Sequence, residues 1–290
     1  MRLIKPKVEI INQKPGVEGL FKHMELCART CYKSEDKITE DSARKFIDNV
    51  IVARGHTAML EHGTVYLIID CSGRLLDVAN KYVNNKYSEW TLHPDGVHYC
   101  ITTNYRVLLQ NGWLDDLQYL CEPTEYHVRR ITVRFICDMG VAREFCRHRV
   151  FSFAQESTRY CNYAKDKFGN ELTFIIPRWL SLGNGFYTYD YPNGFTKDGS
   201  KWDSKLKLNT FLLSLVRSEA AYLELISQGW VAQQARAVLP NSLKTELIMT
   251  GTLTQWEGFF KLRDAESAHP QARELAEPLH AEFRKRGWCE

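Results

Sequence analysis

The sequence predicts an α+β fold, a mostly antiparallel sheet flanked by helices, with a single domain per subunit. The expected strands come singly between helices, without the βαβ cadence and glycine-rich turns that mark a parallel sheet. No internal repeat or low-complexity tract divides the 290 residues, which suffice to bury a full core. We therefore expect one domain over residues 1–290.

The N-terminal part is expected to be helical. A first helix is predicted over residues 17–32 and a second over 41–54. Thr39 is the candidate N-cap of the second helix, and Gly55 would end it.

The middle of the chain carries strand signals. Residues 64–70 read TVYLIID, a run of β-branched and aromatic side chains that favours a strand, and a helix is expected over 74–84. A second strand is expected over 97–103. Within 131–137 apolar residues alternate with polar ones, as in a half-buried strand.

The remaining elements are mostly helical. Gly140 opens a short helix over 141–149, whereas residues 168–202 are rich in Gly, Tyr, Asn and Asp and predict a long irregular excursion or lid. Further helices are expected over 204–228, 232–238, 253–263 and 271–286.

Composition excludes several classes of protein. Apolar residues make up 44% and charged residues 25%, and a net charge of +3 is too small for bulk attraction to nucleic acid or membranes. No signal peptide or membrane span is recognisable, and nine cysteines without a CxxC pair predict reduced thiols without a metal site. We expect a cytoplasmic protein with small-molecule substrates.

Residues 147–160, RHRVFSFAQESTRY, concentrate directed hydrogen-bond donors. Neither GxGxxG nor GxxxxGK[ST] occurs, so a phosphate would have to be held by side chains, and arginine pairs bidentately with oxyanions. One arginine at a helix end is usually a cap or solvated, but this density predicts a ligand with phosphates and a flat ring. The donors concerned are Arg147, His148, Arg149, Ser157, Arg159 and Tyr160, with Arg236 and Arg263 further along the chain.

Two other patterns are less specific. Cys146 and His148 lie two residues apart, where helical side chains diverge, so Cys146 is expected to be a small core residue rather than a nucleophile. GHTAMLEHG, residues 55–63, has the wrong spacing for a zinc helix. His56, Glu61 and His62 fit ligand contacts and plain loop residues equally well.

The motif resembles the signature of the flavin-dependent thymidylate synthases: Arg-His-Arg, seven residues, then Ser157, followed by Arg159-Tyr160. GHTAMLEHG, TFIIP (173–177), ARAVLP and KLRDAESAH resemble further segments of that family. Relative to its compact members, insertions are expected near 85–125 and 168–202, where they would decorate the oligomer or cover the site.

This resemblance implies a homotetramer with FAD bound between subunits. Such enzymes convert dUMP to dTMP with methylenetetrahydrofolate as carbon donor and NADPH as hydride donor. Arg263 would be catalytic, because a fixed cation beside the uracil ring favours its N3-deprotonated form and makes C5 nucleophilic. The implied dUMP contacts are Glu144, Arg147, Gln155, Glu156, Ser157, Thr158, Arg159, Arg236 and Arg263; the implied FAD contacts are Arg147, His148, Arg149, Gln155, Thr252, Thr254 and Gly258.

Some positions depart from the family pattern. Ala154-Gln155 stand where Asn-Glu is frequent, and Gln233 stands where an acid is frequent. Thr252 and Gly258 fall where flavin-contacting Asn or His residues are common, so Thr252 retains one hydroxyl donor and Gly258 only its backbone.

Two other functions fit the same residues. A non-catalytic nucleotide- or RNA-binding protein would retain the arginines and use Phe151, Phe153 and Tyr160 as exposed stacking surfaces. A flavoenzyme with another acceptor would retain FAD and not need Arg159.

Overall fold

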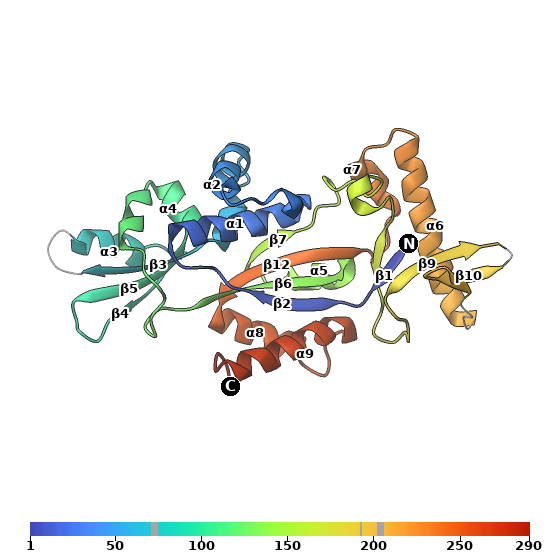
Figure 1. Ribbon diagram of the computed structural model, residues 1–290. Coiled ribbons are helices and arrows are strands. Elements are labelled where there is room, and N and C mark those ends of the chain that lie inside the picture. The colour runs from blue at the N-terminus through green and yellow to red at the C-terminus, as the bar shows by residue number, and fades with distance from the viewer. Residues whose placement is uncertain (71–74, 192, 202–205) are drawn as a thin grey trace.

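Three sheets form the frame of the chain. The computed structural model describes residues 1–70, 75–191, 193–201 and 206–290. The central sheet has the order β2 (Lys7–Ile11), β6 (Arg130–Asp138), β12 (Lys244–Thr252), β7 (Ser152–Gln155), with every pairing antiparallel. Figure 1 shows it between the two other sheets. The predicted α+β class with mostly antiparallel strands is confirmed.

The two flanking sheets use other parts of the chain. One is antiparallel, in the order β3 (Thr64–Asp70), β5 (His98–Asn104), β4 (Glu89–Leu92). The other is mixed, because β1 pairs in parallel with β8. Its order is β11 (Ser200–Lys201), β10 (Gly194–Lys197), β9 (Gly185–Asp190), β1 (Arg2–Ile4), β8 (Thr173–Ile175).

The β6–β12 pair sends its side chains alternately to two faces. Phe135 and its odd-numbered neighbours on β6 join a core cluster with Leu247 and Met249 of β12. Thr132 and Arg134 point to the opposite face, toward α1 (Gly16–Tyr32). This period of two therefore separates an apolar face from one that carries polar and charged groups.

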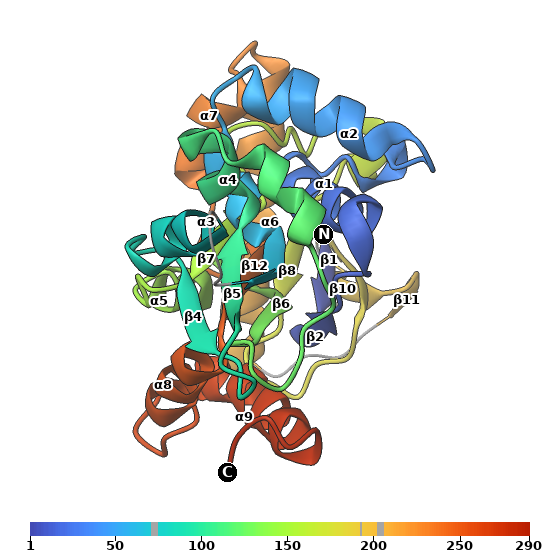
Figure 2. The same ribbon diagram turned by 90° about the vertical axis from the view of Figure 1, so that its left-hand side faces the viewer.

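Helices cover both faces of the central sheet. α5 (Met139–Phe145), α8 (Leu253–Arg263) and α9 (Pro270–Lys285) pack on the apolar face around Trp256 and Phe259, both fully buried. α1 covers the other face, where Cys27 meets Ala154 and Ile248. Figure 2 shows α8 and α9 below the sheets and α1 above them.

The remaining helices lie around this frame. They are α2 (Ser42–Phe46), α3 (Leu75–Val83), α4 (Tyr105–Asn111), α6 (Leu206–Ser227) and α7 (Ala232–Ala235). The expected helices are confirmed and α8 has the predicted bounds, but α5 ends at Phe145, four residues short of the predicted end. Arg74, Ser204 and Lys205 lie outside the described residues. Within those residues, no helix is long and apolar enough to cross a membrane.

The predicted N-cap of the second helix was wrong. Thr39 does not cap the second helix, because Asp41 occupies the N-cap position without a side-chain hydrogen bond; the Ser42 hydroxyl instead accepts from the Thr39 backbone N–H. That helix also continues past Phe46 as a π-helix over Ile47–Val52. The segment ends near Gly55, whose φ of +71° suits glycine.

The segment 168–202 is not irregular. It contains β8, and β9 and β10 form a hairpin that pairs through β9 with the N-terminal strand β1. Strands therefore do not always come singly between helices. The sequence patterns also missed β1, β2, β7 and β12, the last of which lies at the centre of the fold.

A chain of buried side chains crosses the polar face of the central sheet. His23 bonds to Thr132 at 3.1 Å, Thr132 to Thr250 at 2.8 Å, and Thr250 to His62 Nδ1 at 2.8 Å. Burial lowers the pKa of His23 to about 4. Burial, with the nearby charges of His23 and Arg130, lowers the pKa of His62 to about 3. Both rings are therefore neutral in the folded protein at pH 7.

These neutral rings predict acid-dependent stability. Above pH 6.5 they are neutral in both states; below it the unfolded chain binds protons that the folded protein does not, so stability falls until the folded pKa is reached. We expect His62→Gln to reduce the slope of unfolding free energy against pH, between pH 6.5 and 4.5, by about 1.4 kcal/mol per pH unit. Urea titrations at each pH measure this slope. As the control, exposed His269→Gln should give a plot of unfolding free energy against pH that is parallel to that of the unsubstituted protein. A parallel plot for His62→Gln would contradict the account.

Candidate functional site

The two helices on the apolar face converge at their C-terminal ends. Asp138 caps α5 at one end of the β6–β12 pair, and Thr252 caps α8 at the other. Helices of 7 and 11 residues, about 10 and 16 Å long, then run toward each other along a strand pair of 9 residues, about 30 Å long. Their ends therefore meet over the sheet.

Arg263 joins these ends. Its Nη1 donates to the Glu144 carboxylate at 2.7 Å, its Nη2 to the Glu144 backbone oxygen at 2.9 Å, and its Nε to His148 Nε2 at 2.9 Å. The guanidinium thus gives a carbonyl in the last turn of α5 a second donor, beside the Arg147 backbone N–H, and offsets the Glu144 charge in that turn. Of five N–H donors, three are used, which leaves two for a ligand.

His148 is held as a neutral ring. Because Arg263 donates to Nε2, that nitrogen must accept, and the ring proton lies on Nδ1. Burial and the charge of Arg263 lower the pKa of His148 to about 4. The ring lies 5.1 Å from Phe259 and 6.3 Å from Phe151, centroid to centroid. Arg263, Glu144 and His148 therefore form one preorganised group at a half-buried surface.

Strand alternation on β7 divides the next signature residues between the two faces. Gln155 lies on the apolar side, where its amide contacts Thr245 at 3.3 Å. Glu156 follows on the other side and is buried, accepting from Tyr163 at 2.9 Å and from Lys244 at 2.7 Å. The Glu156 side chain is thus committed to internal partners.

A buried ion network supports the loop that follows β7. Lys244 and Lys33 both bind Glu246, at 2.6 and 2.8 Å, and Arg134 binds it too. Burial would raise the pKa of Glu246, but the ammonium groups of Lys244 and Lys33 outweigh it and hold the value at about 2. The network ties Glu156 to α1 and the central strands, which fixes where the signature loop leaves the sheet.

A second polar cluster forms beyond β7, on the side of α1. The Ser157 backbone N–H donates to the Cys31 oxygen at the end of α1, and the Ser157 hydroxyl accepts from the Arg159 N–H at 3.2 Å. Arg159 donates to Gln233 at 3.1 Å, and Arg236 to Thr158 at 3.4 Å. Both guanidiniums are exposed, have neutral partners, and lie ready for an oxyanion.

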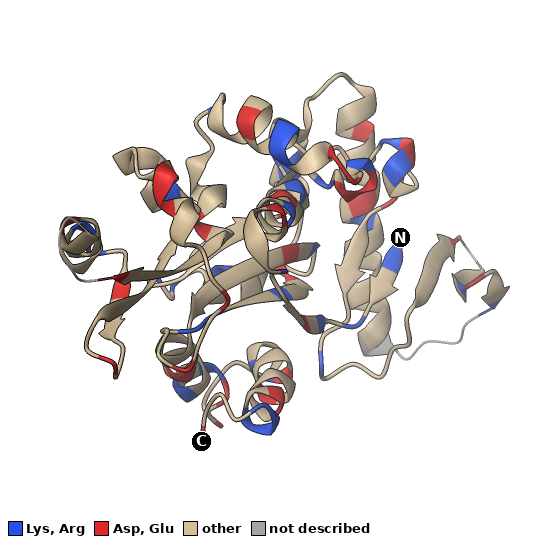
Figure 3. Cartoon of the chain, turned by 60° about the vertical axis from the view of Figure 1, so that its left-hand side comes forward, with Lys and Arg blue, Asp and Glu red and all other residues tan. Residues whose placement is uncertain are grey.

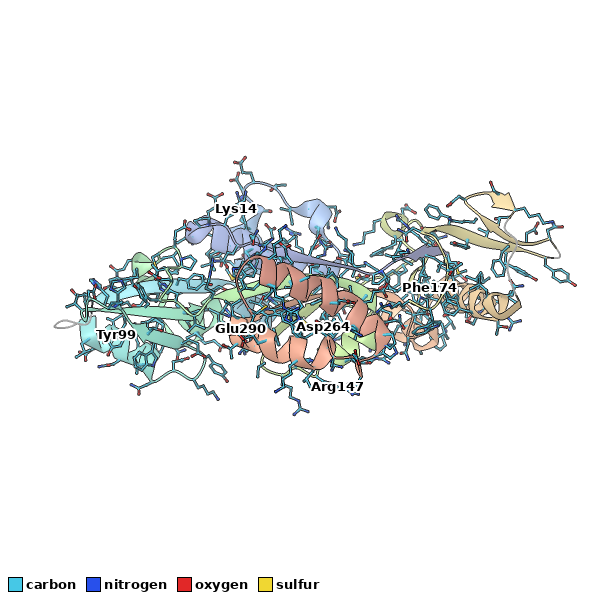
Figure 4. The ribbon with its side chains drawn as sticks, turned by 90° about the horizontal axis from the view of Figure 1, so that it is seen from below. Lys14, Tyr99, Arg147, Phe174, Asp264 and Glu290 are labelled. Atoms are coloured by element: carbon cyan, nitrogen blue, oxygen red, sulfur yellow. The ribbon has the colours of Figure 1, made fainter. Side chains whose placement is uncertain are left out.

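The structure does not bring these two clusters together in one chain. The Arg263 cluster belongs to the face that α8 and α9 cover, whereas α7, which precedes Arg236, lies above the sheets with α1 (Figures 1 and 2). Seen from below, Arg147 and Asp264 lie on the same side as α8 and α9 (Figure 4). Each chain therefore presents two half-sites on opposite faces.

A cavity of about 400 Å³ opens beside the Arg263 cluster. Arg149 and Thr252 both line it, together with Phe151, which contacts the His148 ring. The Thr252 hydroxyl caps Gln255 and retains its own hydrogen for donation. Thr254 and Gly258 lie four apart on the exposed side of α8, and nothing approaches Gly258 within 4 Å of a Cβ position.

The arginines of the signature itself are exposed. The side chains of Arg147 and Arg149 form neither a hydrogen bond nor an ion pair with any described residue. Arg149 lines the cavity, and a guanidinium without an internal partner among the described residues is suited to an anionic ligand.

Several residues that line this cavity, among them Arg130 and Arg106, were not expected from the sequence. Arg130 donates to the Glu61 backbone oxygen at 3.0 Å and to Thr64 at 3.3 Å. The sequence fitted Glu61 equally well to a ligand contact and to a loop residue. Glu61 forms an ion pair with Arg106 and accepts from the Ser152 hydroxyl at 2.8 Å. They come from separate elements and follow no local motif, so no local sequence pattern could have identified them.

His62, His56 and Cys146, whose roles the sequence did not decide or assigned to packing, have distinct surroundings. His62 is buried in the polar chain across the sheet, whereas His56 bonds to the Tyr32 hydroxyl, and Tyr32 packs 5.4 Å from Tyr160. Cys146 is half-buried against the apolar core, and burial raises the pKa of its thiol, as expected for a packing residue. In the part of the chain that the structure describes, no three His, Cys, Asp or Glu side chains gather as a metal site requires.

The family model for thymidylate synthase complementing protein, Thy1, matches residues 123–286, more than half of the chain. The chain belongs to the Thy1 family. The match includes both half-sites and the central strands β6 and β12.

Several relatives carry the name flavin-dependent thymidylate synthase. Those from Pyrococcus furiosus and Aquifex aeolicus are 31% and 26% identical over 150 and 178 residues, covering 52% and 60% of this chain and 52% and 51% of their own lengths. The one from Synechocystis is 25% identical over 195 residues, 64% of this chain and 82% of its own. The chain thus spans about half the length of the first of these Thy1-family relatives.

A solved structure with similarity along the chain is the UMP/dUMP methylase PolB from Streptomyces cacaoi, bound with 5-Br dUMP. It is 19% identical with a TM-score of 0.44, over 98% of this chain and 93% of that one.

The Arg263–His148 contact predicts a measurable titration. Because the charge of Arg263 contributes to the low pKa of His148, Arg263→Gln should raise that pKa above about 4, toward 6.5, while burial keeps it below the ordinary value. An NMR titration of the ring signals measures it. Lys261→Gln, an exposed change on the same helix, is the control. An unchanged pKa in Arg263→Gln would show that the cation does not act on the ring.

Proposed function

We propose that the protein is an FAD-dependent thymidylate synthase that methylates dUMP to dTMP, with methylenetetrahydrofolate as carbon donor and NADPH as reductant. The observation that carries this proposal is the arrangement of Arg263, Glu144 and His148 beside a cavity lined by Arg149 and Thr252. It supplies a fixed cation for a nucleotide base next to a site for an anionic cofactor.

The residues of the larger cavity fit a flavin nucleotide. Arg149 has no internal partner, and Arg130 has only neutral ones, so both can pair with a pyrophosphate. When bound, FAD would accept the hydride from NADPH and pass the one-carbon unit to the nucleotide. The residues proposed to hold it are Arg147, His148, Arg149, Gln155, Thr252, Thr254 and the backbone of Gly258.

Arg263 is proposed to act on the uracil ring. Two of its N–H groups form no hydrogen bond with a described residue and can donate to an oxygen of the ring. This contact stabilises the negative charge of the N3-deprotonated ring, whose C5 is more nucleophilic. Glu144 fixes the position of the guanidinium. His148 is neutral and adds no charge of its own beside Arg263. No protein thiol is needed, which agrees with the inert surroundings of Cys146.

The exposed cluster on the α1 side is proposed to hold the dUMP phosphate. Ser157, Arg159 and Arg236 offer a hydroxyl and two guanidiniums within one hydrogen-bonded group, with Thr158 between them. Glu156 supports this loop from within, so its role in dUMP binding is to position the backbone. Because this half-site and the Arg263 half-site lie on opposite faces, a complete site needs two copies, which supports the proposed homotetramer.

The charge distribution disfavours the alternative of a nucleic-acid-binding protein. Lys and Arg are interspersed with Asp and Glu along the helices and strands visible in Figure 3 and do not gather on one element. Attraction to a nucleic-acid backbone needs several phosphates neutralised at once.

A visible absorption spectrum tests the proposal first. The protein is incubated with FAD, desalted, and measured before and after addition of dUMP. We expect a retained flavin whose spectrum dUMP perturbs, followed by dUMP-dependent oxidation of NADPH and formation of dTMP. A colourless protein indifferent to dUMP would overturn it, and binding to RNA that falls steeply with salt would then favour the alternative.

Flavin affinity should depend on Arg149. Arg149→Ala removes a charge-assisted contact worth about 2 kcal/mol, so the FAD dissociation constant should rise roughly thirtyfold. Fluorescence titration measures it, with exposed Lys261→Ala as control. Equal affinity in Arg149→Ala and the control would remove Arg149 from the flavin site.

Arg236 should act on nucleotide binding. Arg236→Ala should raise KM for dUMP roughly tenfold or more, with a smaller effect on kcat, because a phosphate contact is present in ground and transition states alike. Arg217→Ala on α6, also exposed, is the matched control. A fall in kcat at unchanged KM would assign Arg236 another role.

A further inference from the structure

A second cavity lies on the other side of Arg130. It measures about 300 Å³ and is bounded by the 12–16 segment, by the starts of β3 and β6, and by Trp288 near the C-terminus. Arg130 lines this cavity and the larger one alike. Apart from Arg130, none of the residues proposed to bind FAD or dUMP lines the second cavity.

Arg130 brings to it a charge that forms no ion pair with any described acid, although the Glu61 carboxylate is near enough to act on it electrostatically. Its side chain donates to Thr64 Oγ1 and to the Glu61 backbone oxygen, both neutral, which leaves three of its five N–H groups unused. The carboxylate of Glu61 is bound by Arg106 and Ser152 instead, and no other acid of the described residues pairs with Arg130. Burial of a guanidinium without a carboxylate is costly unless an anion joins it.

The rim adds two more cations and an aromatic surface. Lys14 and Arg129 are exposed and form no ion pair with an acid of the described residues, although Lys14 acts electrostatically on Glu18. Glu122 is the acid in the lining. Three cations against one acid give the lining a net charge of +2. The Arg129 guanidinium lies 5.9 Å from the Trp288 ring, so the indole stands beside the basic groups.

The walls are fixed without a ligand. Gln13 bonds twice to the backbone of Thr64, accepting from its N–H at 2.9 Å and donating to its oxygen at 2.8 Å. The Tyr66 hydroxyl accepts from the Arg130 backbone N–H at 3.0 Å. Trp288 packs 5.2 Å from buried Phe283. A preformed cavity loses little entropy when it binds a ligand.

We propose that this cavity is a second binding site, for a small anion that carries a planar ring. The anionic group pairs with Arg130, Arg129 and Lys14, and the ring lies against Trp288. The proposal does not depend on the thymidylate synthase function. Two sources share this chemistry, a nucleoside monophosphate and an aromatic carboxylate.

Isothermal titration separates these sources. The probes are thymidine monophosphate, p-aminobenzoylglutamate and inorganic phosphate. We expect at least one ring-bearing probe to bind more tightly than phosphate, and Arg129→Ala and Trp288→Leu each to weaken that binding tenfold or more. Lys14→Ala should weaken it too, whereas Arg217→Ala should not. Arg129 and Lys14 are exposed, so their substitution leaves the core intact.

Thymidine monophosphate also fits the proposed substrate site, which Arg236→Ala tests separately. If Arg129→Ala removes one bound molecule per chain and Arg236→Ala another, both sites stand. If only Arg236→Ala has an effect and p-aminobenzoylglutamate binding is absent or insensitive to Arg129→Ala, the second site is wrong while the proposed function stands. Phosphate binding as tightly as both ring-bearing probes would overturn the ring contact.

Discussion

The antiparallel pairing of β6 with β12 is the constraint on which the rest of the structure depends. Nine residues of each strand pair in one continuous register, so the helices that follow the strands begin at opposite ends and converge on the same face. Arg263 meets Glu144 and His148 because of this geometry, although 119 residues separate Arg263 from Glu144. A shift of one residue would turn both faces over and separate them.

The same pairing makes the two faces chemically different. One face buries aromatic rings and positions a cation beside a neutral imidazole, whereas the other carries the polar chain of His23 and the ion network around Glu246. The signature crosses from one face to the other along β7, between Arg149 and Ser157. Because β7 carries the signature from one face to the other, one chain presents a half-site on each face. A site that contains both half-sites would combine two copies of the chain, as we propose.

The family was visible in the sequence, because the signature residues are contiguous and chemically unusual. Helix α8 was also predictable from its apolar spacing. The central strand β12 was missed, since burial on both faces leaves no clear alternation in KTELIMTGT. The β9–β10 hairpin was taken for a loop because its segment is rich in Gly, Asn and Asp, although the aromatic residues and threonines of its strands favour β structure. Arg106 and Arg130 reach the larger cavity only through tertiary pairing, which no local pattern encodes.

Complementation between inactive variants tests most directly whether one site needs two copies. Arg263→Ala and Arg236→Ala each damage a different half-site, and the two proteins would be mixed under conditions of subunit exchange and assayed for dTMP formation. If the half-sites combine across subunits, some sites in the mixture contain neither substitution, and activity should return to roughly a quarter of that of the unsubstituted protein. A mixture as inactive as its components, with exchange verified, would show that each chain builds its site alone and would contradict the account.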